Sequence, residues 1–259
     1  MLTHLKLLLK KLNKMAPLPV SSRISYAAAQ LRKIIKIYSY IPKIGLDNLH
    51  WLIETVEIDY GHFLSYEQKM CVDRNGNPIP WYTYSAIEYL EQLDFSEKEV
   101  YEYGAGNSSI FWAKRAKNVI SIENNQDWYL RIQNNQKSNQ KIIFIEEEEE
   151  YINSILKVKN KYDLIIIDGD FRFACANAAI KCLAKGGFII LDNSDWYPET
   201  SKLIRESGLI QIDFKGMGPI NYYNWTTSIF LHRDINLNPR SQVQPESSIG
   251  SLICKVDPE

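Results

Sequence analysis

Residues that could bind a nucleoside lie close together from position 100 onward. The segment VYEYGAGNSS has an apolar run that ends in Glu102, followed by Gly104 and Gly106, small polar residues and the amphipathic run IFWAKRA. This order predicts a strand, a tight turn and a helix N-terminus. Glycine allows a sharp turn and the close approach of a ligand, and the free amides at a helix N-terminus favour polar or anionic groups.

A carboxylate follows the next predicted strand at a distance that suits a ribose. Glu123 ends the run SIE, 17 residues after Gly106. An acid about 20 residues beyond a glycine turn binds the two ribose hydroxyls of a nucleoside cofactor. The pattern therefore predicts that Glu123 holds the sugar of such a cofactor.

Two classes of cofactor fit this layout. A dinucleotide needs a third glycine, so that the helix can approach the sheet under the pyrophosphate, and Ser109 stands at that position. S-adenosylmethionine has no pyrophosphate, and its amino-acid end suits an acid and small polar groups. Glu102, Asn107 and Ser108 match that end, so the residues favour S-adenosylmethionine and leave a nicotinamide-dependent oxidoreductase as the alternative.

Further acids end two later predicted strands, in the runs IIIDGD and GGFIILDN. Asp168, Asp192 and Asn193 should converge at one sheet edge, and their oxygens suit Mg²⁺. Such a cation would hold a hydroxyl substrate and lower the pKa of that hydroxyl. In the alternative, Asp168 contacts the cofactor or acts as a base without metal, and Asp192 caps a turn. Asp170 is a second catalytic candidate, and Arg172 pairs either with Asp170 or with an anionic substrate group, the structural pair being favoured.

Aromatic residues flank these acids and form the candidate acceptor pocket. Two of them precede the first strand of the sheet, one follows the run DNSD, and one lies before the last strand. For each, the alternative role is packing between segments of the chain. The candidate substrate residues are Trp81, Tyr82, Trp196 and Tyr222.

Alternating strands and helices would position all these groups. Alternation of this kind predicts a mainly parallel sheet with helices on both faces and ligands at the carboxyl ends of the strands. We expect a helical extension over 1–75, a cofactor-binding domain over 76–234 and a loosely ordered tail over 235–259, with Ser85 and Glu88 as a capping box. Strands are predicted at 100–103, 119–123, 142–145, 163–167, 188–192, 209–214 and 226–231, and helices at 2–15, 27–38, 46–56, 108–117, 126–134, 149–156, 174–184 and 199–207.

Across residues 98–232 the motifs EYGAGNS, SIE, IIIDGD and GGFIILDN resemble those of class I S-adenosylmethionine-dependent methyltransferases. The resemblance implies a Rossmann-like α/β fold whose seven-stranded sheet has an antiparallel last strand. It places Glu102, Gly104 and Gly106 along the methionine part and Glu123 at the ribose. It also implies an acid near the adenine after the third strand, where Glu146 or Glu147 is expected.

The DGD and DN motifs look like those of metal-dependent O-methyltransferases, which act on catechols, caffeoyl esters and natural-product sugars. Phe171 stands where the catechol type has a lysine base. This resemblance implies methyl transfer from S-adenosylmethionine to a hydroxyl of a small molecule, with Mg²⁺ as a second cofactor.

Charge is unevenly distributed along the chain of 259 residues. Residues 1–46 hold nine Lys and Arg and no acid, whereas the remainder holds 21 basic and 31 acidic residues. The basic segment predicts either a contact with anionic lipid or a protein partner, or packing on the same chain or a dimer mate. The acidic body disfavours a nucleic-acid substrate.

Cysteine usage and hydropathy limit the location of the protein. The four cysteines have no metal-ligand spacing, and no apolar run reaches the length of a membrane span. We therefore expect a cytoplasmic protein, peripheral to a membrane if residues 1–46 bind lipid. A third hypothesis is an inactive cofactor-binding scaffold that docks through this segment.

Overall fold

The computed structural model describes residues 32, 35–36, 39–40, 45–157 and 161–252. The chain divides into two compact units, residues 1–54 and 55–259. This boundary differs from the predicted one at 75, because residues 55–75 belong to the second unit. The predicted helix at 2–15, most of the helix at 27–38 and most of the proposed contact segment lie outside the described residues.

In the first unit, helix α3 (Leu46–Ile53) follows Gly45, whose φ is 84°. None of its residues is buried. A π-helix (Glu54–Asp59) follows, and all of it except Glu54 belongs to the second unit.

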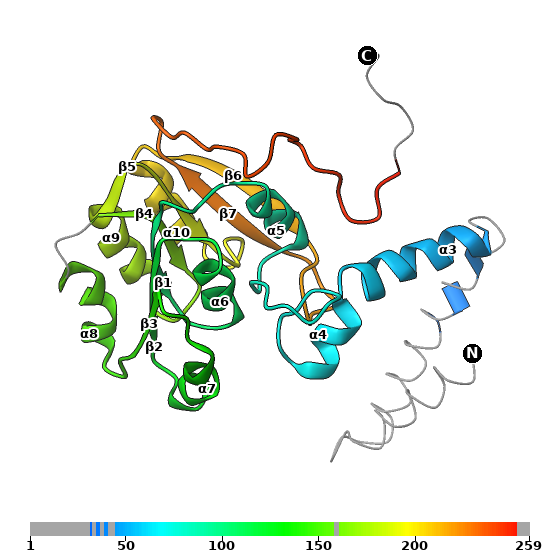
Figure 1. Cartoon of the computed structure of the whole chain (residues 1–259), viewed down its shortest axis with the longest axis horizontal. Coiled ribbons are helices and arrows are strands. Elements are labelled where there is room, and N and C mark those ends of the chain that lie inside the picture. The colour runs from blue at the N-terminus through cyan, green and yellow to red at the C-terminus, as the bar shows by residue number, and fades with distance from the viewer. Residues whose placement is uncertain (1–31, 33–34, 37–38, 41–44, 158–160, 253–259) are drawn as a thin grey trace. The chain divides into compact units, whose positions relative to one another are not determined.

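The second unit is built on a seven-stranded sheet with the order β3-β2-β1-β4-β5-β7-β6 (Figure 1). The first five strands pair in parallel, and β7 is antiparallel to both β5 and β6. The predicted fold class is therefore confirmed. The strands are β1 (Glu99–Tyr103), β2 (Asn118–Glu123), β3 (Gln140–Phe144), β4 (Tyr162–Ile167), β5 (Leu183–Leu191), β6 (Ile210–Gly216) and β7 (Trp225–Leu231).

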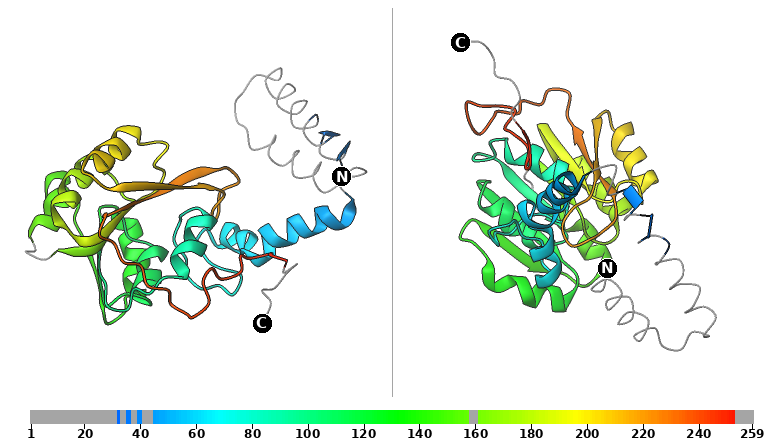
Figure 2. Two further views of the ribbon diagram at one scale, coloured as in Figure 1. Left: turned by 90° about the horizontal axis from the view of Figure 1, so that it is seen from above. Right: turned by 90° about the vertical axis from the view of Figure 1, so that its right-hand side faces the viewer.

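Helices cover both faces of the sheet (Figures 1 and 2). Buried side chains of α5 and α6 pack on one face, and those of α8, α9 and α10 pack on the other. Both faces of the central strands are therefore buried, which explains their continuous apolar runs. The helices are α4 (His62–Gln68), α5 (Tyr84–Glu91), α6 (Asn107–Ala113), α7 (Gln126–Ile132), α8 (Glu148–Asn153), α9 (Arg172–Cys182) and α10 (Pro198–Glu206), with 3-10 turns at Gln133–Asn135 and Ser154–Lys157.

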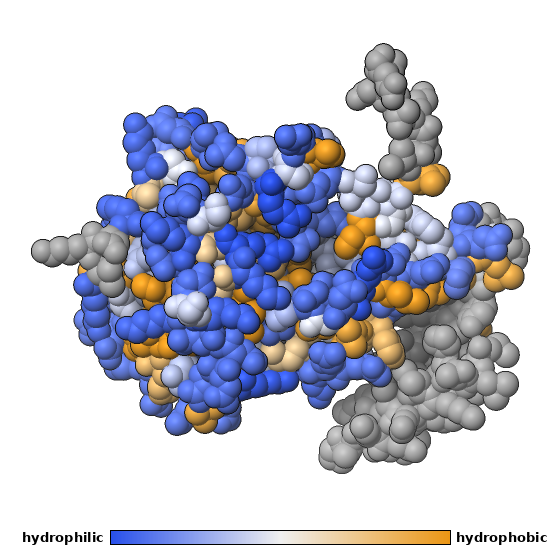
Figure 3. All heavy atoms as spheres, in the orientation of Figure 1, coloured by the Kyte–Doolittle hydropathy of each residue, from blue (hydrophilic) through white to orange (hydrophobic). Residues whose placement is uncertain are grey.

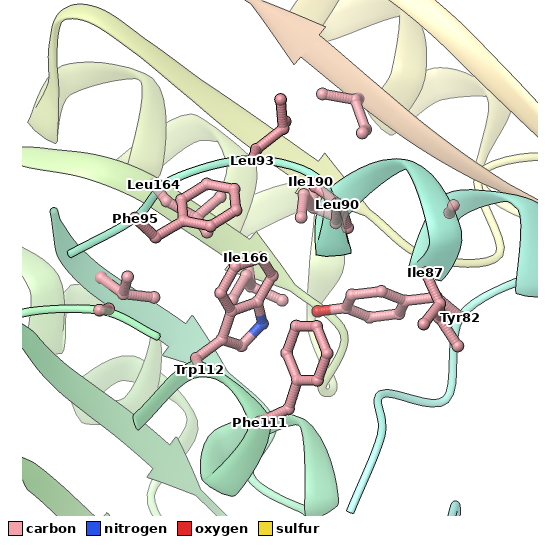
Figure 4. Close-up of a cluster of buried hydrophobic side chains, with 14 of the residues drawn as sticks. Tyr82, Ile87, Leu90, Leu93, Phe95, Phe111, Trp112, Leu164, Ile166 and Ile190 are labelled. Carbon is pink, nitrogen blue, oxygen red and sulfur yellow. The ribbon is translucent and has the colours of Figure 1, made fainter. Parts of the chain in front are cut away.

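Tyr82 belongs to the core on the α5 and α6 face. Its side chain is 0% exposed, and it lies beside Phe111 and Trp112 with its hydroxyl directed toward the indole (Figure 4). The coloured surface in Figure 3, by contrast, is mostly hydrophilic. The structure therefore places Tyr82 in the hydrophobic core, where a large aromatic ring is best desolvated, and not in an acceptor pocket.

Two local expectations differ from the structure. Thr83, not Ser85, is the N-cap of α5, so the predicted capping box is absent. The described part of the tail is held against α5: the amide of Arg240 donates to the carbonyl of Gln92 at 2.7 Å, and the amide of Ile249 donates to Glu88 at 3.1 Å. Among the described residues, no helix is both long and apolar enough to cross a membrane.

The close approach of two strand ends predicts a strict need for glycine at position 104. Gly104 has a φ of 87°, and a Cβ there would lie 2.7 Å from the Cα of Gly169, whereas Gly76 has a φ of 79° and no atom near its own would-be Cβ. Gly76→Ala should cost about 1 kcal/mol of unfolding free energy for the left-handed backbone alone. Gly104→Ala should cost clearly more, because backbone atoms must move. Urea denaturation measures both, and equal losses would contradict this account.

Candidate active site

A cavity of about 530 Å³ lies at the carboxyl ends of the parallel strands. We call it the strand-end cavity. Ligands of open α/β sheets bind at this edge. The cavity brings together most of the residues predicted from the sequence: Trp81, Gly104, Gly106, Asn107, Ser108, Glu123, Asp168, Asp170, Asp192, Asn193 and Trp196.

Glu102 supports the glycine turn from beneath and does not line the cavity. It is 0% exposed, and one of its carboxylate oxygens accepts hydrogen bonds from the hydroxyls of Ser109 and Ser121, the latter at 2.6 Å. The Ser109 hydroxyl in turn accepts from the amide of Gly106 at 3.0 Å. Ser109 therefore links the β1 carboxylate to the turn, which explains a serine at this position.

Glu123 faces the strand-end cavity and holds the glycine turn from the side. Its carboxylate accepts hydrogen bonds from the amides of Ala105 at 2.9 Å, Asn124 at 3.0 Å and Asn125 at 2.8 Å. The side chain is 6% exposed, and burial raises its pKa while these amides lower it. The carboxylate is thus fixed where β2 ends, beside the turn that follows β1.

Trp128 is a cavity residue that the sequence patterns did not reveal. Its indole donates to the carbonyl of Ala105 at 2.5 Å, and its amide donates to the side chain of Asn125, the N-cap of α7. Asn125 is the one residue that could have indicated this position, since an N-cap asparagine fixes the first turn of the following helix, in which Trp128 lies. Trp128 therefore closes the cavity beside the glycine turn.

Arg172 joins the ends of β4 and β5 through every N–H of its guanidinium. Nε donates to the carbonyl of Gly169 at 3.0 Å, and Nη2 donates to the carbonyl and to Oδ1 of Asp168, both at 3.2 Å. Nη1 donates to Oδ1 of Asn193 at 3.0 Å and to the carbonyl of Asp192. The favoured structural pairing of Arg172 with Asp170 is thus replaced by a pairing with Asp168.

The predicted metal ligands do not form a metal site. Oδ1 of Asp168 and Oδ1 of Asn193 already accept from the guanidinium, whose positive charge lies where the cation would be. Oδ1 of Asp192 accepts from Trp225 at 3.1 Å and from Thr227 at 2.5 Å. Within the described ranges, no group of three or more His, Cys, Asp or Glu side chains is arranged to hold a metal. Mg²⁺ therefore does not fit this arrangement.

Asp168 and Asp192 are a close pair of carboxyl groups in the strand-end cavity. Burial raises the pKa of both, the neighbouring Asp168 raises that of Asp192 further, and the Arg172 guanidinium counteracts both shifts. Such a pair is a natural place for proton transfer. Asp170 lies nearer the end of β2, where it accepts from the side-chain amide of Asn124 at 2.9 Å.

Tyr222 is not among the residues that line the strand-end cavity. Its hydroxyl donates to Glu57 at 3.2 Å, and its ring packs edge-on against His62 with centroids 4.4 Å apart. His62 itself is buried and lies 3.2 Å from the hydroxyl of Tyr84. The neighbouring Asn221 and Tyr223 line the cavity instead.

The structure also places Glu147 outside the cavity lining. Its carboxylate caps α8 and accepts from the amides of Glu149 and Glu150. Glu146 is exposed, and it does not line the cavity either. A carboxylate that satisfies free amides at a helix start has a structural role, so Glu147 is not available to an adenine.

Residues with a strained backbone lie around the strand-end cavity. All four non-glycine residues with positive φ in the described part of the chain lie at the cavity or directly before Arg172, and such strain is concentrated at functional sites. They are Lys69 at 51°, Phe171 at 53°, Asn193 at 51° and Ile220 at 70°. The sequence carried no signal for Lys69, Met70 and Cys71, which reach the cavity from the segment after α4.

No protein-family model matches this chain, and no curated protein matches it. Among solved structures, the chain is similar to precorrin-6y C5,15-methyltransferase from Geobacter metallireducens, with 15% identity and a TM-score of 0.46 over 57% of this chain and 86% of that one. It is also similar to a putative O-methyltransferase from Klebsiella pneumoniae, with 17% identity and a TM-score of 0.45 over 57% and 78%. A putative methyltransferase from Streptococcus mutans in complex with SAH has 13% identity and a TM-score of 0.40 over 54% and 92%.

Burial of Glu102 predicts a specific pH dependence of stability. Desolvation raises its pKa from 4.5 to about 7, so folding favours the protonated form. The contribution of Glu102 to the free energy of unfolding is fully present below pH 4.5 and is lost as the pH rises through 7. Each unit by which its pKa differs between the folded and unfolded states corresponds to about 1.4 kcal/mol. Glu102→Gln should therefore gain stability relative to wild type between about pH 5 and pH 7.5 in urea titrations. Glu146→Gln, the control at an exposed position, should show no such gain. Parallel curves of unfolding free energy against pH for all three proteins would contradict the prediction.

Proposed function

We propose that this chain is an S-adenosylmethionine-dependent methyltransferase acting on a hydroxyl of a small molecule. The observation that carries the proposal is the buried Glu123 carboxylate, which faces the strand-end cavity beside the glycine turn. Three backbone amides use part of the acceptor capacity of its two oxygens, and a ribose hydroxyl can donate to the capacity that remains, in the manner of a nucleoside cofactor.

The cofactor lies across the ends of β1 and β2 in this proposal. The backbone of Gly104 to Ser108 faces the methionine part. The adenine lies on the other side of the ribose, beside Asn124, Asn125 and Trp128, which line the cavity there. Since all these groups converge on one cavity, a single extended ligand can contact them together.

The acceptor lies toward Asp168, Asp192 and the aromatic residues of the cavity. Its hydroxyl oxygen attacks the methyl carbon in line with the departing sulfur, and the hydroxyl proton passes to Asp168. A positioned base typically contributes about 10²–10⁴-fold to such a step. The cavity volume of about 530 Å³ suits a small molecule, and the acidic residues around it disfavour a polyanion.

The nicotinamide alternative is not favoured by the glycine turn. Ser109 is buried, with its hydroxyl between the amide of Gly106 and the carboxylate of Glu102. A dinucleotide site needs a glycine at this position, so that the helix can lie close beneath the pyrophosphate.

Cofactor binding is tested by calorimetry with S-adenosylhomocysteine. We expect wild type to bind it and Glu123→Gln to bind it at least about 10-fold more weakly, because a hydrogen bond to a charged group contributes about 1.5–3 kcal/mol. The matched control, Glu146→Gln, should bind like wild type. Binding of NAD⁺ in place of S-adenosylhomocysteine would overturn the proposal.

Methyl transfer is tested with a panel of hydroxylated small molecules and labelled S-adenosylmethionine. Asp168→Asn should lower turnover by at least about 100-fold while S-adenosylhomocysteine affinity stays unchanged, because the base is lost and an amide oxygen can still accept from Arg172. Asp195→Asn is the matched control, since Asp195, in the segment after β5, accepts from the amide of Thr226 in β7 and lies outside the cavity lining. Cofactor binding without methylation of any acceptor would favour an inactive scaffold.

A further inference from the structure

The acceptor side of the strand-end cavity already contains a fixed positive charge. The guanidinium of Arg172 is bounded by Oδ1 of Asp168, Oδ1 of Asn193 and the carbonyls of Asp168, Gly169 and Asp192. Its side chain is 9% exposed. This is an all-oxygen environment, the kind that binds a hard cation in other proteins.

The guanidinium is saturated by these partners. Arginine has five N–H donors in a fixed plane, and each of them has an acceptor here. Its face also lies over the ring of Tyr197, 4.6 Å from the centroid. No donor is left for an anionic substrate group, so Arg172 acts on the acceptor only through the residues that it holds.

We infer that Arg172 is the resident cation of this site, standing where the sequence predicts a divalent metal and positioning Asp168 and Asn193 in its stead. A metal held by Asp168 and Asn193 would compete with the guanidinium for their Oδ1 atoms, and it would bring a second positive charge against the guanidinium. The two cations therefore exclude one another.

A metal-free site also restricts how the acceptor is selected, if the proposed methyl transfer is correct. Without a metal, an acceptor cannot be selected by chelation through two neighbouring oxygens. It is instead held by contacts with residues such as Trp81, Trp196 and Asn221, which line the cavity. A single hydroxyl on a ring that can stack on indole is sufficient, and turnover should be unchanged by EDTA.

Manganese binding to cofactor-free, full-length protein tests the inference without reference to methyl transfer. Wild type and Arg172→Lys should bind no Mn²⁺ in calorimetry or in electron paramagnetic resonance. Arg172→Ala should bind about one equivalent, because the oxygens are released. Arg205→Ala removes an exposed arginine of α10 that contacts Gln211, and should behave like wild type.

Two results would overturn the inference: stoichiometric Mn²⁺ binding by wild type, or binding by Arg172→Ala that is no stronger than by Arg205→Ala. If Arg172→Ala does not fold, Arg172→Gln, which is neutral and can still donate hydrogen bonds, takes its place in the same comparison. Addition of guanidinium ion should also displace Mn²⁺ from the alanine variant. S-adenosylhomocysteine affinity is measured separately, so failure of the proposed function would leave the Mn²⁺ result standing.

Discussion

The anchoring of the turn after β1 by two carboxylates is the interaction on which the candidate site depends. Glu102 accepts a hydrogen bond from the hydroxyl of Ser109, which in turn accepts from the turn amide of Gly106. Glu123, at the end of the neighbouring strand, accepts from the amide of Ala105. The parallel register pairs Glu102 with Ser121, so β2 also supports the buried carboxylate. Because backbone amides satisfy the side-chain oxygens of Glu123, the turn keeps its shape without a ligand. A cofactor would therefore meet a preorganised surface.

A second anchor holds the opposite side of the strand-end cavity. Arg172 begins α9, directly after a residue with a left-handed backbone, and binds the ends of β4 and β5 together. An arginine suits this position because its planar group can meet several oxygens at once, which a lysine cannot do. The two anchors divide the cavity into a side built on β1 and β2, which suits a nucleoside, and a side built on β4 and β5, which contains the acids.

Much of the fold and the nucleoside side could be predicted from local patterns. Apolar runs located the strands within a few residues, and the spacing from Gly106 to Glu123 identified two groups that the sheet indeed brings together. The side of the cavity built on β4 and β5, and the aromatic residues around it, were less predictable. Aromatic residues suit a pocket, yet Tyr82 lies in the core and Tyr222 packs on His62. Glu147 followed the right strand, but its carboxylate caps a helix.

Local patterns in the chain are enough to give the order of elements, the parallel sheet and the edge at which its polar groups gather, because hydrophobic periodicity and chain direction depend on neighbouring residues alone. How those groups pair with one another depends on the three-dimensional packing. Asp168, Asp192 and Asn193 are equally good ligands for a metal or for a guanidinium, and their types and spacing cannot distinguish the two. The choice depends on the rotamer and packing of Arg172 against Tyr197, a contact between α9 and the residue that precedes α10. Contacts of this kind arise from the packing of whole elements, which no local pattern in the chain encodes.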